Sequence, residues 1–251
     1  MLNLRPEDAL HKSYVNRLLI EIIDEPYLSH TLVFKGGTCA SMLGYLDRFS
    51  IDLDFDMVKD ADEKMIQEKI NAIFKHLGLP ATEKKIGTAH LFQIRYPSVP
   101  FKRNTIKLSI NTLIVQSNYY KVQYLPEIDR LMNTQTIETM FANKLVAITD
   151  RYALHRSIAG RDIYDIHHFF LHGYAYTPAV ITERTESSVV DYFEKLIQFI
   201  KSRVTQTSIN EDLNTLLPND RFQSMRKILL PETLQFLEKE RDRLRAESDR
   251  E

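Results

Sequence analysis

Three aspartates alternate with apolar residues in the segment 51–57, a spacing that could place several carboxylates on one side of a strand. Asp52, Asp54 and Asp56 stand two positions apart, and alternate side chains of a strand share a face. Aspartate is uncommon in strands, and like charges on one face repel one another. A divalent metal ion would supply the missing positive charge. The pattern therefore predicts an acidic, metal-binding face opposite a buried apolar one.

A pair of glycines precedes this segment. Gly36 and Gly37 are followed by Thr38, after the apolar residues 32–34 and before the helix-like residues 40–43. Glycine lets the backbone come close to a ligand, and the amides at a helix N-terminus favour phosphate. A plainer interpretation stays open, because paired glycines often form a simple turn and an acid-rich edge strand can serve only to discourage aggregation.

The glycine turn, the helix after it and the sequence Ser-Ile-Asp-Leu-Asp-Phe at 50–55 together resemble the signature of the polymerase-beta-like nucleotidyltransferase superfamily. The longer motif reads Lys-Gly-Gly-Thr, followed by Arg-Phe-Ser-x-Asp-Leu-Asp-Phe. It is similar to the AbiEii-type nucleotidyltransferase toxins of bacterial abortive-infection and toxin–antitoxin systems. The resemblance covers roughly positions 30–170. Gly37 and Asp52 stand 15 positions apart, slightly more than is usual for the superfamily, so we expect an extended helix or loop between them.

The resemblance implies transfer of a nucleoside monophosphate from an NTP to an acceptor hydroxyl, with release of pyrophosphate. Asp52 and Asp54, and not Asp56, would be catalytic and would hold Mg²⁺ or Mn²⁺ ions. The turn formed by Gly36 and the two residues after it would cradle the triphosphate. The resemblance also implies a tRNA 3′ end as the acceptor and a cognate antitoxin as a partner.

The C-terminal half offers a lysine and two acids. Lys144 interrupts the apolar stripe of a predicted helix over residues 137–152, which by itself favours a side chain that extends to water. Asp162 and Asp165 begin the next helix on one face, where acids can simply complement the helix dipole. The resemblance instead implies that Lys144 contacts phosphate and that Asp162 is the functional acid, with Asp165 held in reserve.

The predicted strands at 90–96 and 105–115 leave the first half short of acids. Superfamily members often place a third carboxylate on a strand here, whereas this chain has Ser109 and Asn111. We therefore expect Lys144 and Asp162 to complete an active site between two lobes. Neither side chain is expected to matter for the fold itself.

The chain as a whole predicts an α+β protein with a nucleotidyltransferase lobe at 1–125, containing a small mixed sheet, and a helical lobe at 126–251 that closes over the cleft. A net charge of −1 over 251 residues provides no global basic field. The single cysteine, Cys39, excludes an internal disulfide and is interpreted as a buried thiol. The consecutive residues His167 and His168 diverge around a helix and are given no role.

The expected location is the cytoplasm, without a membrane partner, because the first residues lack an uninterrupted apolar run and no segment approaches membrane-spanning length. Two alternatives stay open. The acceptor could be a small molecule or a protein hydroxyl, or the chain could be a catalytically inactive binding module.

Overall fold

The computed structural model describes residues 6–98 and 102–249. The chain divides into two compact units. The sheet unit comprises Met1–Ile114 and Tyr119–Thr136, and the helical unit comprises Val115–Asn118 and Ile137–Glu251. The boundary expected at residue 126 lies inside a hairpin, both of whose strands belong to the sheet.

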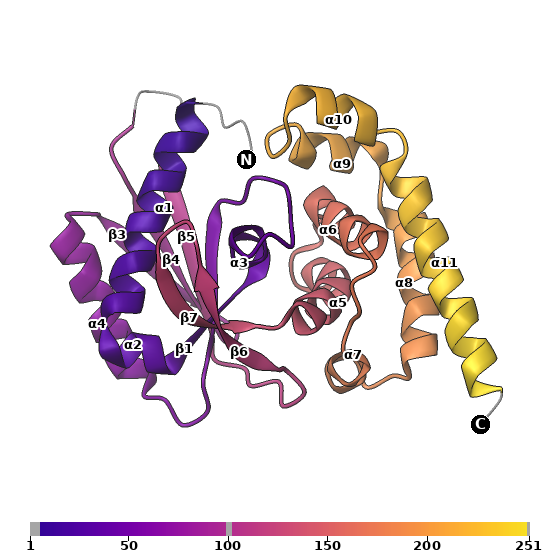
Figure 1. The fold of residues 1–251 in the computed structure, drawn as a ribbon, viewed down its shortest axis with the longest axis horizontal. Helices are drawn as coiled ribbons and strands as arrows, with labels where there is room; N and C mark the ends of the chain where they lie inside the picture. The colour runs from indigo at the N-terminus through magenta and orange to yellow at the C-terminus, as the bar shows by residue number, and fades with distance from the viewer. Residues whose placement is uncertain (1–5, 99–101, 250–251) are drawn as a thin grey trace. The chain divides into compact units, whose positions relative to one another are not determined.

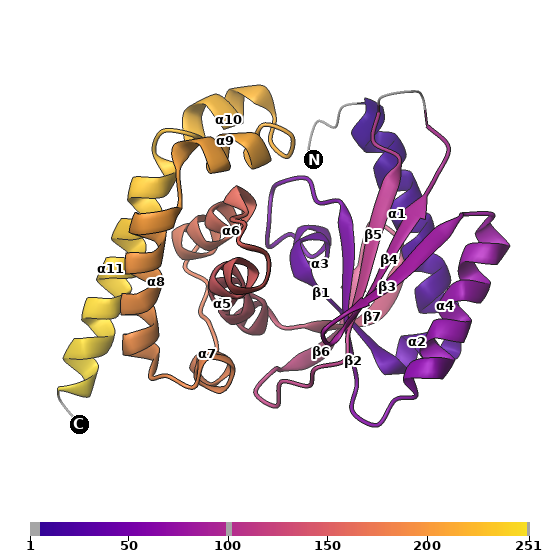
Figure 2. The ribbon, with the colours of Figure 1, turned by 180° about the vertical axis from the view of Figure 1, so that it is seen from behind.

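Within the described residues, one mixed sheet of seven strands forms the centre of the sheet unit (Figures 1 and 2). Its order is β3-β4-β5-β2-β1-β7-β6. Two neighbouring pairs, β1 with β7 and β2 with β5, are parallel, and the remaining pairs are antiparallel. The strands are β1 (Leu32–Lys35), β2 (Asp52–Met57), β3 (Ala81–Ile86), β4 (Ala89–Arg95), β5 (Thr105–Asn111), β6 (Tyr120–Leu125) and β7 (Arg130–Gln135).

This architecture confirms the predicted α+β class with a mixed sheet, but three strands had no clear signal in the sequence. Every residue of β3 is exposed, so the strand lacks the alternation of apolar and polar residues that a half-buried strand shows. The strands β6 and β7 form a hairpin that joins the sheet through the pair Phe34 and Thr134. That parallel pairing links residues far apart in sequence, which a local pattern cannot indicate.

Within the residues that the structure describes, four helices belong to the sheet unit. They are α1 (Pro6–Asp24), α2 (Pro26–Thr31), α3 (Gly36–Met42) and α4 (Glu63–Leu77). The bounds of α4 follow from its sequence, because the Asp62 carboxylate accepts hydrogen bonds from the amides of Lys64 and Met65 at 2.9 and 3.2 Å. Gly78, in the left-handed conformation with φ of 65°, ends the helix.

One face of the sheet is apolar and packs in the core. Leu53 and Phe55 on β2 and their register partners Leu108 and Ile110 on β5 are buried on this face. Phe92 on β4 continues it. Because side chains alternate along a strand, the aspartates of β2 point to the opposite face.

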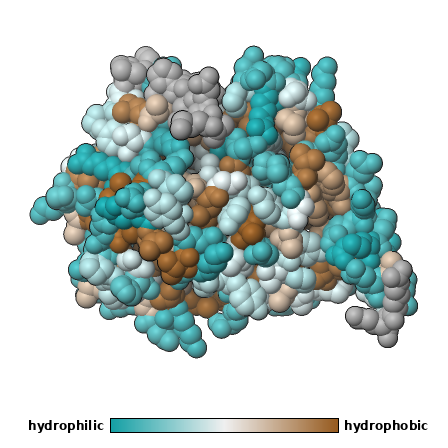
Figure 3. Space-filling model, viewed as in Figure 1, coloured by the Kyte–Doolittle hydropathy of each residue, from teal (hydrophilic) through white to brown (hydrophobic). Residues whose placement is uncertain are grey.

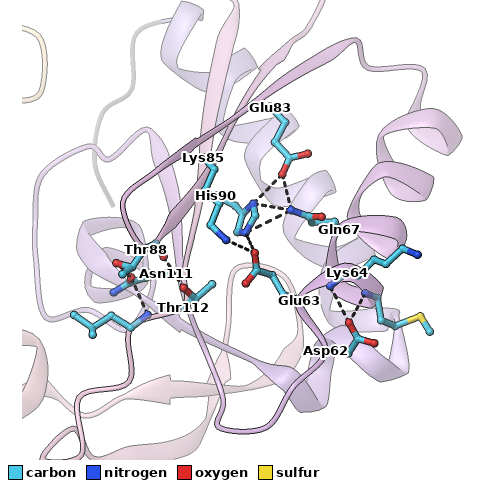
Figure 4. A network of polar contacts seen from close by, with 12 residues as sticks. Asp62, Glu63, Lys64, Gln67, Glu83, Lys85, Thr88, His90, Asn111 and Thr112 are labelled. Atoms are coloured by element: carbon cyan, nitrogen blue, oxygen red, sulfur yellow. Dashed lines mark hydrogen bonds and ion pairs between the residues drawn. The ribbon is translucent and has the colours of Figure 1, made fainter.

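The outer part of the sheet is tied to α4 by a polar network around His90 (Figure 4). His90 is buried on β4, with Nε2 2.5 Å from Glu63 of α4 and Nδ1 2.8 Å from Glu83 of β3. Lys85 of β3 also contacts Glu63, at 2.5 Å. Since one carboxylate faces each ring nitrogen, the network fixes the β3–β4 hairpin against α4.

The helical unit packs around α6 and α5. Its helices are α5 (Ile137–His155), α6 (Gly160–Leu171), α7 (Pro178–Thr185), α8 (Val189–Arg203), α9 (Gln206–Leu213), α10 (Asn219–Met225) and α11 (Leu229–Ser248). Tyr164 and Phe169 of α6 are buried, and Phe169 packs on Phe141 of α5 with ring centroids 5.2 Å apart. Gly160 opens α6 directly against α9, where a Cβ atom would lie 2.5 Å from the Cα of Ile209.

Apolar residues on the surface are distributed rather than pooled in the view of Figure 3, where small hydrophobic groups alternate with hydrophilic ones. Among the residues that the structure describes, no helix combines the length and apolar character needed to cross a membrane.

Candidate active site

Asp52 and Asp54 lie on an interior strand. β2 is flanked by β1 and β5, so the alternative of an acid-rich edge strand is wrong. Both aspartates are half-buried, whereas Leu53 between them is fully buried on the other face. Burying the apolar half of the strand therefore holds two carboxylates side by side on the opposite face, about 7 Å apart along the strand.

The third aspartate of the strand has a different environment. Asp56 is buried, and its carboxylate accepts hydrogen bonds from Lys35 Nζ at 2.5 Å and from Gln135 Nε2 at 2.7 Å. The negative charge of Asp56 is thus matched inside the sheet by a lysine from β1. That Asp52 and Asp54 bind the metal ions, while Asp56 does not, stays a prediction that fits this difference.

Gly36 brings the turn after β1 into contact with Asp54. Its φ is +78°, and a Cβ atom at this position would lie 2.5 Å from Oδ2 of Asp54. Both the left-handed backbone and the close approach require glycine. Gly37 is similarly confined, since a Cβ atom there would lie 2.7 Å from a guanidinium nitrogen of Arg48.

Thr38 connects the start of α3 to the start of β2. Its side chain is buried, donates a hydrogen bond to the Asp52 carbonyl, and lies 2.9 Å from the Ser50 hydroxyl. The threonine hydroxyl is thus directed into the protein. The N-cap residue of α3, Lys35, makes no capping hydrogen bond through its side chain, and the first amides of a helix have no partner within the helix itself. Any contact of this turn with a triphosphate is therefore assigned to backbone amides.

Two supporting side chains in this region were not singled out from the sequence. Lys35 neutralises Asp56, and Arg48, which is 2 % exposed, packs against Gly37 and donates to the Phe49 carbonyl at 3.0 Å. Both residues stand within the segments that carry the resemblance. Their position in these segments was the one signal in the sequence for a role in supporting the site. Their bonding partners, however, depend on tertiary packing.

The donor set suits magnesium. Mg²⁺ prefers oxygen ligands and is commonly held by one or two carboxylates together with phosphate oxygens of a substrate. In the described ranges, no group of three or more His, Cys, Asp or Glu side chains is arranged to hold a metal ion. The pair Asp52 and Asp54 fits a site in which the nucleotide supplies the remaining oxygens.

In the helical unit, Lys144 of α5 meets both acids of α6. Its Nζ lies 3.0 Å from Asp162 Oδ1 and 3.0 Å from Asp165 Oδ2. Arg151 adds a second cation, 3.3 Å from Asp162. The two carboxylates share a face of the helix, as their spacing predicted. The sequence left open which of the two acids is the functional one. In the structure both acids contact the same lysine.

The acids of this cluster are buried. The side chains of Asp162 and Asp165 are 1 % and 0 % exposed, while that of Lys144 is 18 % exposed. Burial raises the pKa of Asp162, but the charges of Lys144 and Arg151 and the Lys144 hydrogen bond outweigh burial and lower the pKa to about 2. Only the lysine of this trio therefore keeps a partly accessible head group.

The residues that were given no catalytic role take part in packing or hydrogen bonds within the protein. His167 Nε2 lies 2.8 Å from Glu232, and the ring of His168 stacks on His172 with centroids 4.0 Å apart. Cys39 is buried, and burial raises its pKa well above the usual value, which keeps a thiol protonated. On β5, the Asn111 side-chain oxygen accepts hydrogen bonds from the Thr88 hydroxyl and the backbone amide of Leu113 (Figure 4).

Comparison with known proteins agrees with these observations. The family model described as "Nucleotidyl transferase AbiEii toxin, Type IV TA system" matches residues 17–242. No curated protein matches the sequence significantly.

Several solved structures share the fold. A putative nucleotidyltransferase from Helicobacter pylori is 23% identical with a TM-score of 0.56, and covers 96% of this chain and 99% of its own. The protein JHP933 from Helicobacter pylori is 23% identical with a TM-score of 0.52, and covers 98% and 100%. MenT4, a nucleotidyltransferase toxin from Mycobacterium tuberculosis H37Rv, is 16% identical with a TM-score of 0.51, and covers 93% and 85%.

Proposed function

Since the chain belongs to the AbiEii family of nucleotidyl transferase toxins of type IV toxin–antitoxin systems, we propose that it transfers a nucleoside monophosphate from an NTP to a hydroxyl group of tRNA. The observation that carries this proposal is the close approach of Gly36 to the Asp54 carboxylate. It places the glycine turn at the start of α3 directly beside the pair of acids.

Asp52 and Asp54 would bind Mg²⁺ through their carboxylate oxygens. The bound ions would activate the acceptor hydroxyl and stabilise the leaving oxygen. The protein's own contribution is to hold both carboxylates on a strand whose other face is buried. Thr38 keeps this arrangement fixed, because its hydroxyl bonds to the backbone of Asp52.

The turn at residues 36–38 would bind the triphosphate through backbone amides. Gly36 and Gly37 carry no Cβ atom, which lets the Asp54 carboxylate and the Arg48 guanidinium lie directly against the turn. Backbone amides are fixed donors that lose little entropy when a ligand binds. They suit a group whose charge grows in the transition state.

Lys144 would contact a phosphate group of the nucleotide. Its ammonium is held at 3.0 Å by both Asp162 and Asp165, and it is the partly exposed member of the trio. Asp162 is fully buried with a pKa lowered to about 2, which makes it a poor acceptor for a substrate proton. We assign Asp162 and Asp165 as positioning residues that orient Lys144.

The acceptor is proposed to be the 3′ end of tRNA, and a cognate antitoxin would neutralise the activity. The test is incubation of purified protein with Mg²⁺, total tRNA and each labelled NTP in turn, with Asp52→Asn as the matched inactive control. Labelled tRNA is expected with the wild type and absent with the variant. Labelling should also decline steeply as salt is added, because binding to nucleic acid releases counterions.

Two other outcomes would contradict the proposal. If a small hydroxyl compound or a protein is labelled and tRNA is not, the acceptor belongs to that other class. No incorporation into any acceptor, with Mg²⁺ or Mn²⁺ and all four NTPs, would favour an inactive binding module.

A further inference from the structure

Lys107 is the direct strand partner of Asp52. β5 runs parallel to β2 in a register that pairs Asp52 with Lys107 and Asp54 with Ser109. Residues in register on neighbouring strands point to the same side of the sheet, with their backbones about 4.8 Å apart. Ile106 and Leu108 on either side are buried on the apolar face. Lys107 therefore stands beside the first carboxylate of the pair, on the acidic face.

The ammonium group of Lys107 is available to a ligand. Lys107 is exposed, and within the described part of the chain its side chain makes no hydrogen bond or ion pair. Lys35, which lies on the same face, is instead bonded to Asp56 at 2.5 Å. The two lysines thus differ: one completes the interior of the sheet, and the other extends from it next to Asp52.

We propose that Lys107 binds the triphosphate of the nucleotide beside the metal ions held by Asp52 and Asp54, an inference that rests on the proposed nucleotidyl transfer. A triphosphate brings several negative charges to the face where Asp52 and Asp54 already lie. A lysine is a compact cation on a flexible stem, which suits contact with a phosphate oxygen whose position is set by other groups. The neighbouring positions on β5, Ser109 and Asn111, carry no charge.

A purely structural role predicts a different behaviour. If Lys107 served only to balance Asp52, its removal would disturb the carboxylate pair and weaken metal binding. If it binds triphosphate, its removal takes away a cation that repels Mg²⁺ and attracts nucleotide. Binding of metal alone and binding of nucleotide should then change in opposite directions.

The experiment compares Lys107→Met and Lys107→Arg with the wild type. Calorimetry measures binding of the α,β-methylene analogues of the four NTPs in excess Mg²⁺, and Mn²⁺ binding without nucleotide is measured by electron paramagnetic resonance. The control is Lys84→Met, since Lys84 is an exposed lysine on β3, three strands from β2 in the sheet order. Thermal unfolding checks that each variant is folded.

For Lys107→Met we expect about tenfold weaker binding of the preferred analogue, with Mn²⁺ binding unchanged or tighter. Lys107→Arg should keep most of the affinity, and Lys84→Met should match the wild type. Unchanged analogue binding in Lys107→Met would overturn the inference. So would an equal loss of Mn²⁺ and analogue binding.

The outcomes separate this inference from the proposed function. A wild-type protein that binds an analogue but transfers no nucleotide contradicts the function, while the comparison of Lys107 variants still stands. A wild-type protein that transfers nucleotide, together with a fully active Lys107→Met, contradicts only the inference. Failure of the wild type to bind any analogue would overturn both.

Discussion

Lys144 and Asp165 form an ion pair of 3.0 Å in which the carboxylate is fully buried. The same ammonium lies 3.0 Å from the equally buried Asp162. A buried charge is stable only with a partner, so the lysine supports the packing of α5 against α6 as well as any contact with nucleotide. The sequence alone predicts that loss of Lys144 or Asp162 leaves the fold intact. These buried ion pairs predict instead that either loss destabilises the helical unit.

We predict that Lys144→Met destabilises the helical unit by about 3–5 kcal/mol and abolishes transfer. The destabilisation follows because the substitution removes a counter-charge from two buried carboxylates. Urea unfolding gives the free energy of unfolding, and labelled NTP gives the rate.

A double variant separates the two effects. In Lys144→Met with Asp165→Asn, the remaining charges of Asp162 and Arg151 still balance, so much of the lost stability should return. Activity should stay absent because the phosphate contact is missing. If activity recovers together with stability, Lys144 has a structural role and does not contact phosphate.

Acid should weaken the same cluster. The pKa of Asp162 is lowered from 3.8 to about 2 in the folded chain, so its ionised form is favoured by folding. This contribution is present above pH 3.8 and is lost as the pH falls through about 2, which corresponds to about 2 kcal/mol. The free energy of unfolding of Asp162→Asn should therefore decline less between pH 4 and 2 than that of the wild type. Parallel slopes would contradict the assigned ion pairs.

Gly36→Ala should lose activity through contact with Asp54. The matched control is Gly44→Ala, since both glycines have a φ of +78°, but a Cβ atom at Gly44 would meet nothing within 4 Å. Both variants bear the backbone strain, about 1–2 kcal/mol. Only Gly36→Ala should also displace the carboxylate, with a loss in rate of roughly 10²-fold or more. Equal activities, measured at matched stability, would remove this contact from the site.

The three aspartates of β2 should separate into two classes. Asp52→Asn and Asp54→Asn should each abolish transfer and weaken Mn²⁺ binding, with little change in stability. Asp56→Asn leaves the Lys35 ammonium without its carboxylate and should instead cost about 1–3 kcal/mol of stability. Mn²⁺ titration and thermal unfolding measure both effects. An inactive but fully stable Asp56→Asn, beside an active Asp52→Asn, would shift the metal site by two residues.

Local patterns in the sequence determined the parts of this protein whose physical cause is local. Alternation along residues 52–57 and 105–111 follows from the two faces of a strand, and the bounds of α4 follow from the carboxylate of Asp62 and the left-handed Gly78. The glycine turn and the aspartate pair in that order, with the later Lys144 and the acids Asp162 and Asp165, carried the resemblance to the family. None of these features requires knowledge of what lies across space.

Pairing between distant segments was decided only by the tertiary structure. The parallel contact of Phe34 with Thr134 brings the β6–β7 hairpin into the sheet and sets the unit boundary at Thr136. It also brings Gln135 to Asp56. The register of β2 with β5 likewise selects Lys107 as the neighbour of Asp52. A strand's own sequence specifies its buried and exposed faces, but its neighbours and its register depend on how all the apolar faces are buried together.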